Sequence, residues 1–328
     1  MITIKDVAKK AGVSISTASY ALNNDSRVKK ETKERIIKIA EELNYIPSGT
    51  ARNLKKKKNK TIGVCVTEFG GPVWTELLEG IHTEILEQGY NLIVTSGKSA
   101  ERMLLDRQTD AVIVNDSSLP DDLIRRVSNE NFPIVVLGRH VNHPHVYEMM
   151  IENEASAYTM TKFLLDKGYQ SIGYLSGVED AYDNLYRFKG FVKALSEINK
   201  DIPFYYKGDF TKQSGYNTIK QIINENKVMP EALFCANDEM AIGAMDALKK
   251  SGYHIPKDIA VVGFDDIELS RYYTPPLTTI KIDRIQFGKD VAKHILKICS
   301  MSLEERKTFE EDFYYSEIKG ELIKRKSA

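Results

Sequence analysis

The sequence contains no long apolar run. Its longest apolar stretches, such as residues 259–264, have the length of a β-strand, far below the roughly 20 residues that a membrane-spanning helix needs. The N-terminal stretch MITIKDVAKK also lacks the apolar core of a signal peptide. We therefore expect no membrane span and a cytoplasmic location.

Cysteine is scarce as well. The 3 cysteines, Cys65, Cys235 and Cys299, are odd in number, far apart and without C-x-x-C spacing. This pattern predicts buried thiols and argues against a disulfide framework or a zinc site.

Net charge is absent from the whole chain but not from its parts. Residues 1–60 hold 15 Lys and Arg against 6 Asp and Glu, which gives +9. The whole chain holds 46 of each, so the remainder holds 31 against 40, which gives −9. A small basic segment joined to an acidic body is typical of a nucleic-acid-binding head on a larger domain, although a solvated basic surface would give the same count.

The first twenty-two residues predict two short helices with a tight turn between them. Thr3 and Asp6 have the spacing of a capping box, Gly12 suits the turn, and Ser14 can cap the second helix. That second helix buries small apolar side chains and leaves polar ones outside, which suits a DNA major groove. The residues expected on its outer side are Ile15, Ser16, Thr17, Ser19 and Tyr20. An ordinary helical hairpin is the alternative.

A third helix is expected over residues 30–43, with Ile36, Ile37, Ala40 and Leu43 completing a three-helix core. Basic residues near its start are placed for phosphate contacts. Residues 47–60 follow and contain a helical turn or two and then four lysines. This segment reads either as a flexible basic linker or as a hinge helix that forms on DNA, with Leu54 as an apolar wedge in the minor groove.

From Thr61 onward, strands and helices alternate. Two successive βαβ series, beginning near TIGV and SIGY, predict an α/β fold with two doubly wound parallel-sheet lobes. Ligands of such folds lie beyond the carboxyl ends of the strands, here in the cleft between the lobes.

Enzyme and metal motifs are not convincing. No G-x-G-x-x-G follows a strand, and Gly97-Lys98-Ser99 has Leu92 where a phosphate loop needs its first glycine. His140, His143 and His145 cluster around a proline without a carboxylate or thiol at regular spacing, so we expect a solvated loop. We predict no catalytic residues, no metal and no cofactor.

At this point the chain resembles the lactose/galactose repressor (LacI/GalR) family over nearly its whole length. The matching motifs are TIKDVAKKAGVS, YIPSGTARNL, TIGV, PVWTELLEGI, RFKGF, ALFCANDEMAIGAM, HIPKDIAVVGFDD and PPLTTI. The resemblance implies a homodimeric transcription regulator that binds a pseudo-palindromic double-stranded DNA operator and senses a small molecule, most often a sugar.

The resemblance also implies the DNA-binding residues. Base contacts would come from Ile15, Ser16, Ser19 and Tyr20, with Ser14, Thr17 and Asn23 near phosphates and Thr3 at the start of the first helix. Leu54 matches the hinge leucine and Ala51 the small residue beside it. Many relatives carry Arg where this chain has Tyr20, and Tyr cannot pair bidentately with guanine.

For the cleft, the resemblance implies effector contacts from both lobes: Thr67, Phe69, Val73, Trp74 and Asn115 from the first, and Arg187, Phe210, Asn237 and Asp265 from the second. Charged groups can bond hydroxyls, and flat aromatic faces suit sugar rings. Two alternatives stay open: Trp74 could be a core residue, and Asn237 could simply cap the helix that it precedes.

The sequence thus predicts three regions, a helix-turn-helix domain (1–46), a hinge and basic linker (47–60) and a two-lobed effector and dimerisation domain (61–328). Together they describe a dimeric repressor controlled by a carbohydrate. Control by a protein corepressor or a non-sugar ligand is the alternative, and a cytoplasmic sugar-binding protein is a remoter one.

Overall fold

The computed structural model describes residues 2–46, 59–199, 204–307 and 315–328. The chain divides into two compact units, residues 1–59 and 60–328, which we call the head and the body. Within the described residues, no helix has both the length and the apolarity to cross a membrane. The predicted hinge lies almost entirely outside the described residues.

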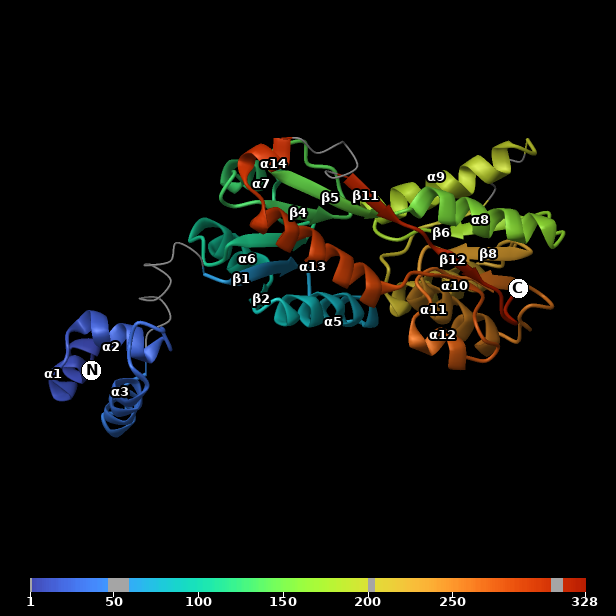
Figure 1. Cartoon of the computed structure of the whole chain (residues 1–328). Coiled ribbons are helices and arrows are strands. Elements are labelled where there is room, and N and C mark those ends of the chain that lie inside the picture. Colours follow the sequence, from blue (N-terminus) through green and yellow to red (C-terminus); the bar gives the residue numbers. More distant parts are fainter. Residues whose placement is uncertain (1, 47–58, 200–203, 308–314) are drawn as a thin grey trace. The chain divides into compact units, whose positions relative to one another are not determined.

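The head is a three-helix unit (Figure 1) of α1 (Ile4–Ala11), α2 (Ile15–Leu22) and α3 (Lys30–Glu42). Gly12 ends α1 at a φ of 63°, a left-handed conformation that costs glycine little. Ser14 then caps α2, because its hydroxyl oxygen accepts a hydrogen bond from the backbone N–H of Thr17 at 3.0 Å. The predicted helix-turn-helix is therefore confirmed.

The head core corrects one detail of the sequence analysis. Val7, Ala18 and Ile36 are fully buried, but Ile37, which we expected in the core, is 38% exposed. Ile39 packs against the core instead. The reason is the helical period: Ile36, Ile39 and Ala40 share one face of α3, whereas position 37 is turned away from it by about 100°.

The first lobe of the body is a six-stranded parallel sheet in the order β11-β5-β4-β3-β1-β2. Its strands are β1 (Thr61–Val66), β2 (Asn91–Thr95), β3 (Ala111–Asn115), β4 (Ile134–Leu137), β5 (Val146–Ile151) and β11 (Tyr315–Ile318). Apolar side chains point to both faces, as continuous apolar strands require. One face packs under α5 (Pro72–Glu87) and α13 (Arg284–Ser300), and the other under α6 (Gly97–Leu105) and α7 (Asp121–Val127). A short helix, α14 (Leu303–Lys307), follows α13.

The second lobe is a four-stranded parallel sheet in the order β7-β6-β8-β9. Its strands are β6 (Ile172–Leu175), β7 (Tyr205–Tyr206), β8 (Ala232–Cys235) and β9 (Ala260–Val262). Its helices are α8 (Asn153–Asp166), α9 (Tyr182–Ser196), α10 (Lys212–Asn224), α11 (Asp238–Lys250) and α12 (Glu268–Tyr272). A two-stranded antiparallel ribbon of β10 (Thr279–Lys281) and β12 (Glu321–Ile323) lies beside it. The predicted doubly wound α/β fold is confirmed.

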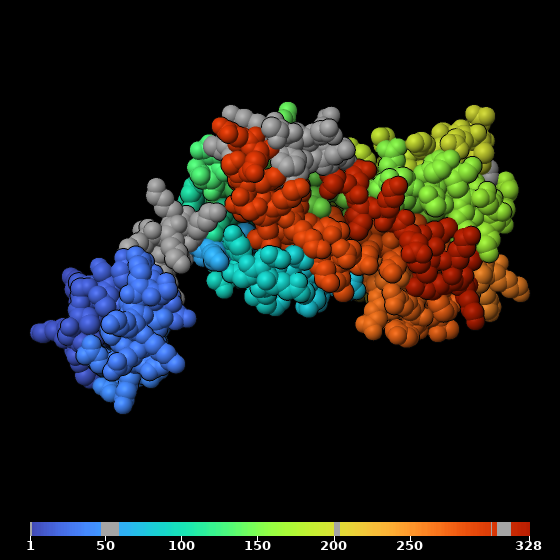
Figure 2. All heavy atoms as spheres, in the orientation of Figure 1, coloured from blue at the N-terminus to red at the C-terminus, as the bar shows by residue number. Residues whose placement is uncertain are grey.

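The lobes are not two successive segments, as the sequence analysis expected. After the second lobe, α13 packs on α5 of the first lobe, β11 joins the edge of the first sheet, and β12 pairs with β10. Figure 2 shows the red C-terminal residues stretched across the surface of the body. Short strands such as β11 pair only with a distant partner, so local periodicity did not reveal them.

Candidate functional site

The outer side of α2 carries the predicted DNA-binding residues. Ile15 is 47% exposed, and Ser16 is exposed beside it. Two of the predicted polar side chains also serve the helix ends: Ser14 caps the first turn, and Asn23 Nδ2 donates to Ser19 O at 2.7 Å. Thr3 belongs to α1, where its N–H and hydroxyl each donate to Asp6 Oδ2 at 2.8 Å. These bonds lower the pKa of Asp6. Ala51 and Leu54 lie outside the described residues.

Tyr20 is only partly on the outer side. Its ring is half-buried against the head core, and the Arg27 guanidinium carbon lies 3.8 Å from the ring centroid. Asp25 holds that guanidinium through a 2.6 Å ion pair. The sequence analysis placed the basic residues before and at the start of the third helix near phosphates. Arg27 is one of these residues, and the structure brings its guanidinium directly beside the α2 surface.

The body contains a cavity of about 330 Å³ between its lobes. Eight of the predicted effector residues line it: Thr67, Val73, Trp74, Asn115, Arg187, Phe210, Asn237 and Asp265. Phe69 does not line the cavity and is 61% exposed. In the loop after β1 the neighbouring Glu68 and Gly70 line the cavity instead, and Phe69 as an effector contact stays a prediction.

Arg187 is held rigidly at the base of the cavity. Its side chain is 3% exposed, Nε donates to Asn153 Oδ1 at 2.8 Å, and Nη1 donates to Ala236 O at 2.6 Å. Its guanidinium carbon lies 3.8 Å from the centroid of the Phe264 ring. These contacts fix the plane of the guanidinium and orient its remaining N–H groups.

Asp265 is shared by two arginines. Arg284 Nη2 donates to Asp265 Oδ1 at 2.6 Å, and Arg187 Nη2 lies 3.6 Å from the same oxygen. Asp265 has a φ of 114°, which is rare for a residue with a side chain and marks a conformation held by its surroundings. Arg284 also lines the cavity, and the sequence analysis missed it. Its place at the start of α13, directly after the ribbon strand β10, could have pointed to the lobe junction.

Asn237 caps α11, as one of the open alternatives proposed. Its Oδ1 accepts from the Met240 N–H at 3.0 Å, and its Nδ2 donates to Phe210 O at 2.8 Å. That second bond holds the loop of Phe210, whose φ is 72°. The Phe210 ring lies against Gly177, where an added Cβ would sit 2.2 Å from the ring.

The carboxyl group of Asp238, at the start of α11, is buried next to the residues that line the cavity. Asp238 accepts hydrogen bonds from Ser270 Oγ at 2.6 Å, Thr279 Oγ1 at 2.5 Å and the Ile267 N–H at 3.0 Å. Burial, with a contribution from nearby Asp265, raises the pKa of Asp238 to about 8. This network ties the start of α11 to the loop that carries Asp265.

The other clusters do not form a comparable site. Contrary to our expectation, His140 does have a nearby carboxylate, since Nδ1 lies 2.7 Å from Glu148 Oε2. Even so, no group of three or more potential metal ligands occurs among the residues that the structure describes. Cys65 and Cys235 are buried free thiols, as predicted, and Cys299 is partly buried.

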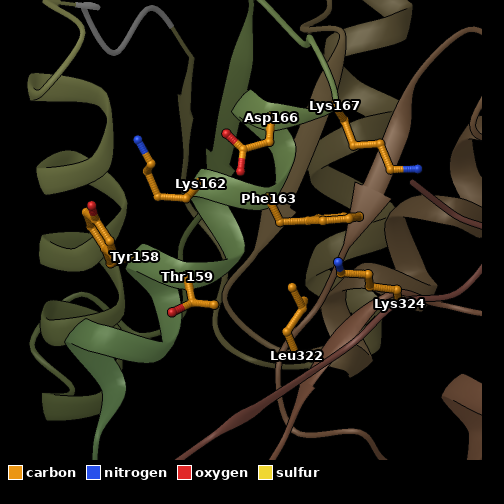
Figure 3. A pocket seen from close by; sticks show the side chains of 8 residues that line it. All are labelled: Tyr158, Thr159, Lys162, Phe163, Asp166, Lys167, Leu322 and Lys324. Carbon is orange, nitrogen blue, oxygen red and sulfur yellow. The ribbon is translucent and has the colours of Figure 1, made fainter.

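A second hollow lies on the surface of the second lobe, between α8 and β12 (Figure 3). It measures about 420 Å³, and three lysines, Lys162, Lys167 and Lys324, line it. Two of them lie near the Phe163 ring, with Lys167 Nζ 5.5 Å and Lys324 Nζ 5.4 Å from the ring centroid. It includes none of the predicted effector residues. The cleft between the lobes is therefore the candidate ligand site.

A helix-turn-helix head and a two-lobed α/β body with a polar cleft define a DNA-binding transcription regulator. Comparison with known proteins agrees with this class. Residues 3–48 match the family described as bacterial regulatory proteins, lacI family, and residues 161–327 match a periplasmic binding protein-like domain.

Two curated relatives cover most of the chain. The HTH-type transcriptional repressor PurR of Aliivibrio salmonicida is 36% identical over 94% of this chain and 96% of its own length. The protein of the same name from Haemophilus influenzae is 34% identical over 90% and 91%. A crystal structure of the lac repressor dimer, bound to operator and the anti-inducer ONPF, superposes with a TM-score of 0.85 at 30% identity, covering 99% of this chain and 98% of that one.

The chain belongs to the LacI family of DNA-binding transcriptional repressors.

Proposed function

We propose that this repressor is controlled by a small carbohydrate bound in the cleft between its lobes. The observation that carries this proposal is the cavity itself, where the fixed Arg187 guanidinium faces a space walled by the aromatic rings of Trp74 and Phe210. Charged donors bond hydroxyl oxygens, and flat rings stack on the apolar faces of sugars. The lac repressor relative, crystallised with ONPF, supports a small-molecule ligand.

A non-sugar ligand is the second candidate. The relatives called PurR bear a name that refers to no sugar. In addition, both the oxygen and the nitrogen of the Asn237 amide already form hydrogen bonds within the protein, which leaves this side chain less available to a sugar hydroxyl. A protein corepressor is the third candidate, and it differs in that no small molecule alone would change operator affinity.

On DNA, we propose that the protein acts as a cytoplasmic homodimer whose two heads occupy adjacent major grooves of a near-palindrome. Thr3, Ser14, Ile15, Ser16, Thr17, Ser19, Tyr20 and Asn23 would contact the operator, with Ala51 and Leu54 in the hinge. The Arg27 charge beside Tyr20 would add a phosphate or base contact. Tyr272, 75% exposed, and Leu269, 48% exposed, offer an apolar patch on the body for the subunit contact.

The test is a thermal-shift screen of the full chain against mono- and oligosaccharides, followed by operator binding with and without each hit. A ligand that binds only the folded protein raises the unfolding midpoint by mass action. We expect a saturable sugar hit that changes operator affinity, and we expect Arg187→Lys to lose this response while free operator binding persists. A sugar response that survives in Arg187→Lys would contradict the cleft assignment, and a blank sugar panel would favour the non-sugar candidate.

A further inference from the structure

The cleft is dominated by negative charge. Five carboxylates line it, those of Glu68, Asp183, Asp209, Glu239 and Asp265. Against these stand two guanidinium groups, those of Arg187 and Arg284, and no lysine is among the lining residues. With every group ionised, the wall carries two positive and five negative charges, a net −3.

Both positive charges are already neutralised within the protein. Arg284 is paired with Asp265 at 2.6 Å, and Arg187 lies between Asp265 at 3.6 Å and Asp183 at 4.0 Å. An incoming phosphate or carboxylate would therefore have to displace Asp265 to gain a full ion pair. Breaking a buried pair leaves one partner uncompensated, which is strongly unfavourable.

Two of the carboxylates come from opposite lobes. Glu68 belongs to the loop after β1, and Glu239 lies in the first turn of α11. Glu239 Oε1 reaches the first lobe, since a Cβ added to Gly71 would lie 3.9 Å from it. Neither carboxylate has a hydrogen bond or ion pair with another described residue. Burial first, and the charges of Asp265 and Glu68 next, raise the pKa of Glu239. Both carboxylates are therefore free to accept hydrogen bonds from a ligand.

Arg284 does not balance this pair with a free donor. The residue is 7% exposed, its Nη2 donates to Asp265, and its Nε–H is buried. The groups of the cavity wall that stay open to a ligand are therefore mainly hydrogen-bond acceptors, above all the carboxylates of Glu68 and Glu239.

From these contacts we infer that the cleft selects an uncharged ligand, which gives O–H or N–H donors to Glu68 and Glu239, and that it rejects phosphorylated and carboxylated ligands. A phosphate group would place two further negative charges beside a net negative wall. A donor group between Glu68 and Glu239 would also join the two lobes, so binding would favour their closed arrangement. This inference rests on the proposed cleft ligand and narrows its chemical class.

The experiment uses calorimetry on the full chain with matched pairs of probes. The pairs are glucose and glucose 6-phosphate, ribose and ribose 5-phosphate, cellobiose and cellobionic acid, and adenosine and its 5′-monophosphate. We expect the neutral member of at least one pair to bind at least about tenfold more tightly than its anionic partner, because like charges repel in the cleft. A tighter anionic member, or no binding by any neutral member, would overturn the inference.

Variants test the role of the two carboxylates. The double variant Glu68→Gln with Glu239→Gln removes two of the repelling charges, so the ratio of neutral-probe affinity to anionic-probe affinity should fall by about tenfold or more. Glu79→Gln replaces an exposed carboxylate on α5 and should leave this ratio of affinities unchanged. An unchanged ratio in a folded double variant would overturn the roles assigned to Glu68 and Glu239.

The result can be told apart from a failure of the proposed function. Operator binding and its response to the bound probe are measured on the same preparation. An anionic probe that binds tightly and shifts operator affinity would leave ligand control intact while overturning the selection of uncharged ligands.

Discussion

The two acidic side chains of the sequence GFDD show how adjacent residues acquire different chemistry. Asp265 faces the cleft and is shared by Arg187 and Arg284. Asp266 turns the other way and pairs with Arg325 at 2.5 Å and Arg271 at 3.1 Å. Both have positive φ, at 114° and 55°. The strained turn therefore directs one carboxylate to the cleft and the other to the protein interior.

At the same scale, Asp238 predicts a pH dependence of stability. Its pKa is raised from 3.8 to about 8 by burial, so the folded protein keeps a proton that the unfolded chain releases. Stability contributed by this group should fall as the pH rises between those values, by up to about 1.4 kcal/mol per pH unit. Denaturant unfolding at pH 5 to 8 measures it. Asp238→Asn should flatten the dependence, and the exposed Asp122→Asn should not; equal slopes in wild type and Asp238→Asn would contradict the assignment.

At the scale of elements, the body is built from three helix pairs, α5 with α13, α8 with α9, and α10 with α11. Each pair meets at glycine. A Cβ at Gly80 would lie 2.1 Å from Ile285 O, one at Gly190 2.0 Å from Glu154 O, and one at Gly215 2.2 Å from Met240 O. The glycines let backbone meet backbone, and in α13 this close approach sets the position of Arg284 four residues before Gly288.

Gly288→Ala should consequently destabilise the body. The added methyl would lie 2.3 Å from Leu77 O, a backbone atom that cannot rotate away, and such overpacking costs about 1–3 kcal/mol. Urea unfolding monitored by the single tryptophan, Trp74 of α5, reports this pair of helices directly. Gln286→Ala, exposed on the same helix, serves as the matched control. A Gly288→Ala variant as stable as that control would show that the helices can separate at no cost.

At the scale of the whole molecule, the charge is divided between the two units. Residues 1–60 carry +9 and the rest of the chain −9. The basic head is attracted to the phosphate backbone, whereas the acidic body is repelled from it and, by our inference, from anionic ligands too. The zero net charge of the whole chain is thus the sum of a basic head and an acidic body, which interact with anions in opposite ways.

The charge division predicts a steep salt dependence of operator binding. If the two heads of a dimer neutralise about 6–10 phosphates, affinity should fall by roughly 10³–10⁵ between 50 and 200 mM salt. Fluorescence anisotropy with labelled operator measures the slope, and the affinity of a neutral cleft ligand serves as the internal control, since it should change little. A shallow slope for the operator would mean that the basic residues of the head do not contact phosphates.

Features that depend on short-range interactions were predictable from the amino-acid sequence. Capping at Ser14, the turn at Gly12 and the apolar strands of both sheets follow from local backbone preferences and periodicity, which neighbouring residues specify. The motif resemblance pointed to most of the cleft residues in the same way. The direction of loop side chains could not be predicted in this way, because a loop has no fixed period. Glu68 lines the cavity, for example, and Phe69 does not.

The position of the C-terminal elements and the charge of the cleft became known only from the three-dimensional structure. The return of α13, β11 and β12 depends on pairing between segments far apart in the chain, and it is this return that brings Arg284 to Asp265 across 19 residues and into the cleft. The net charge of the cleft likewise could not be counted before its wall was known, because its carboxylates come from separate loops and helices. Long-range packing therefore gives a chain of zero net charge an acidic cleft, in which both arginines already have carboxylate partners.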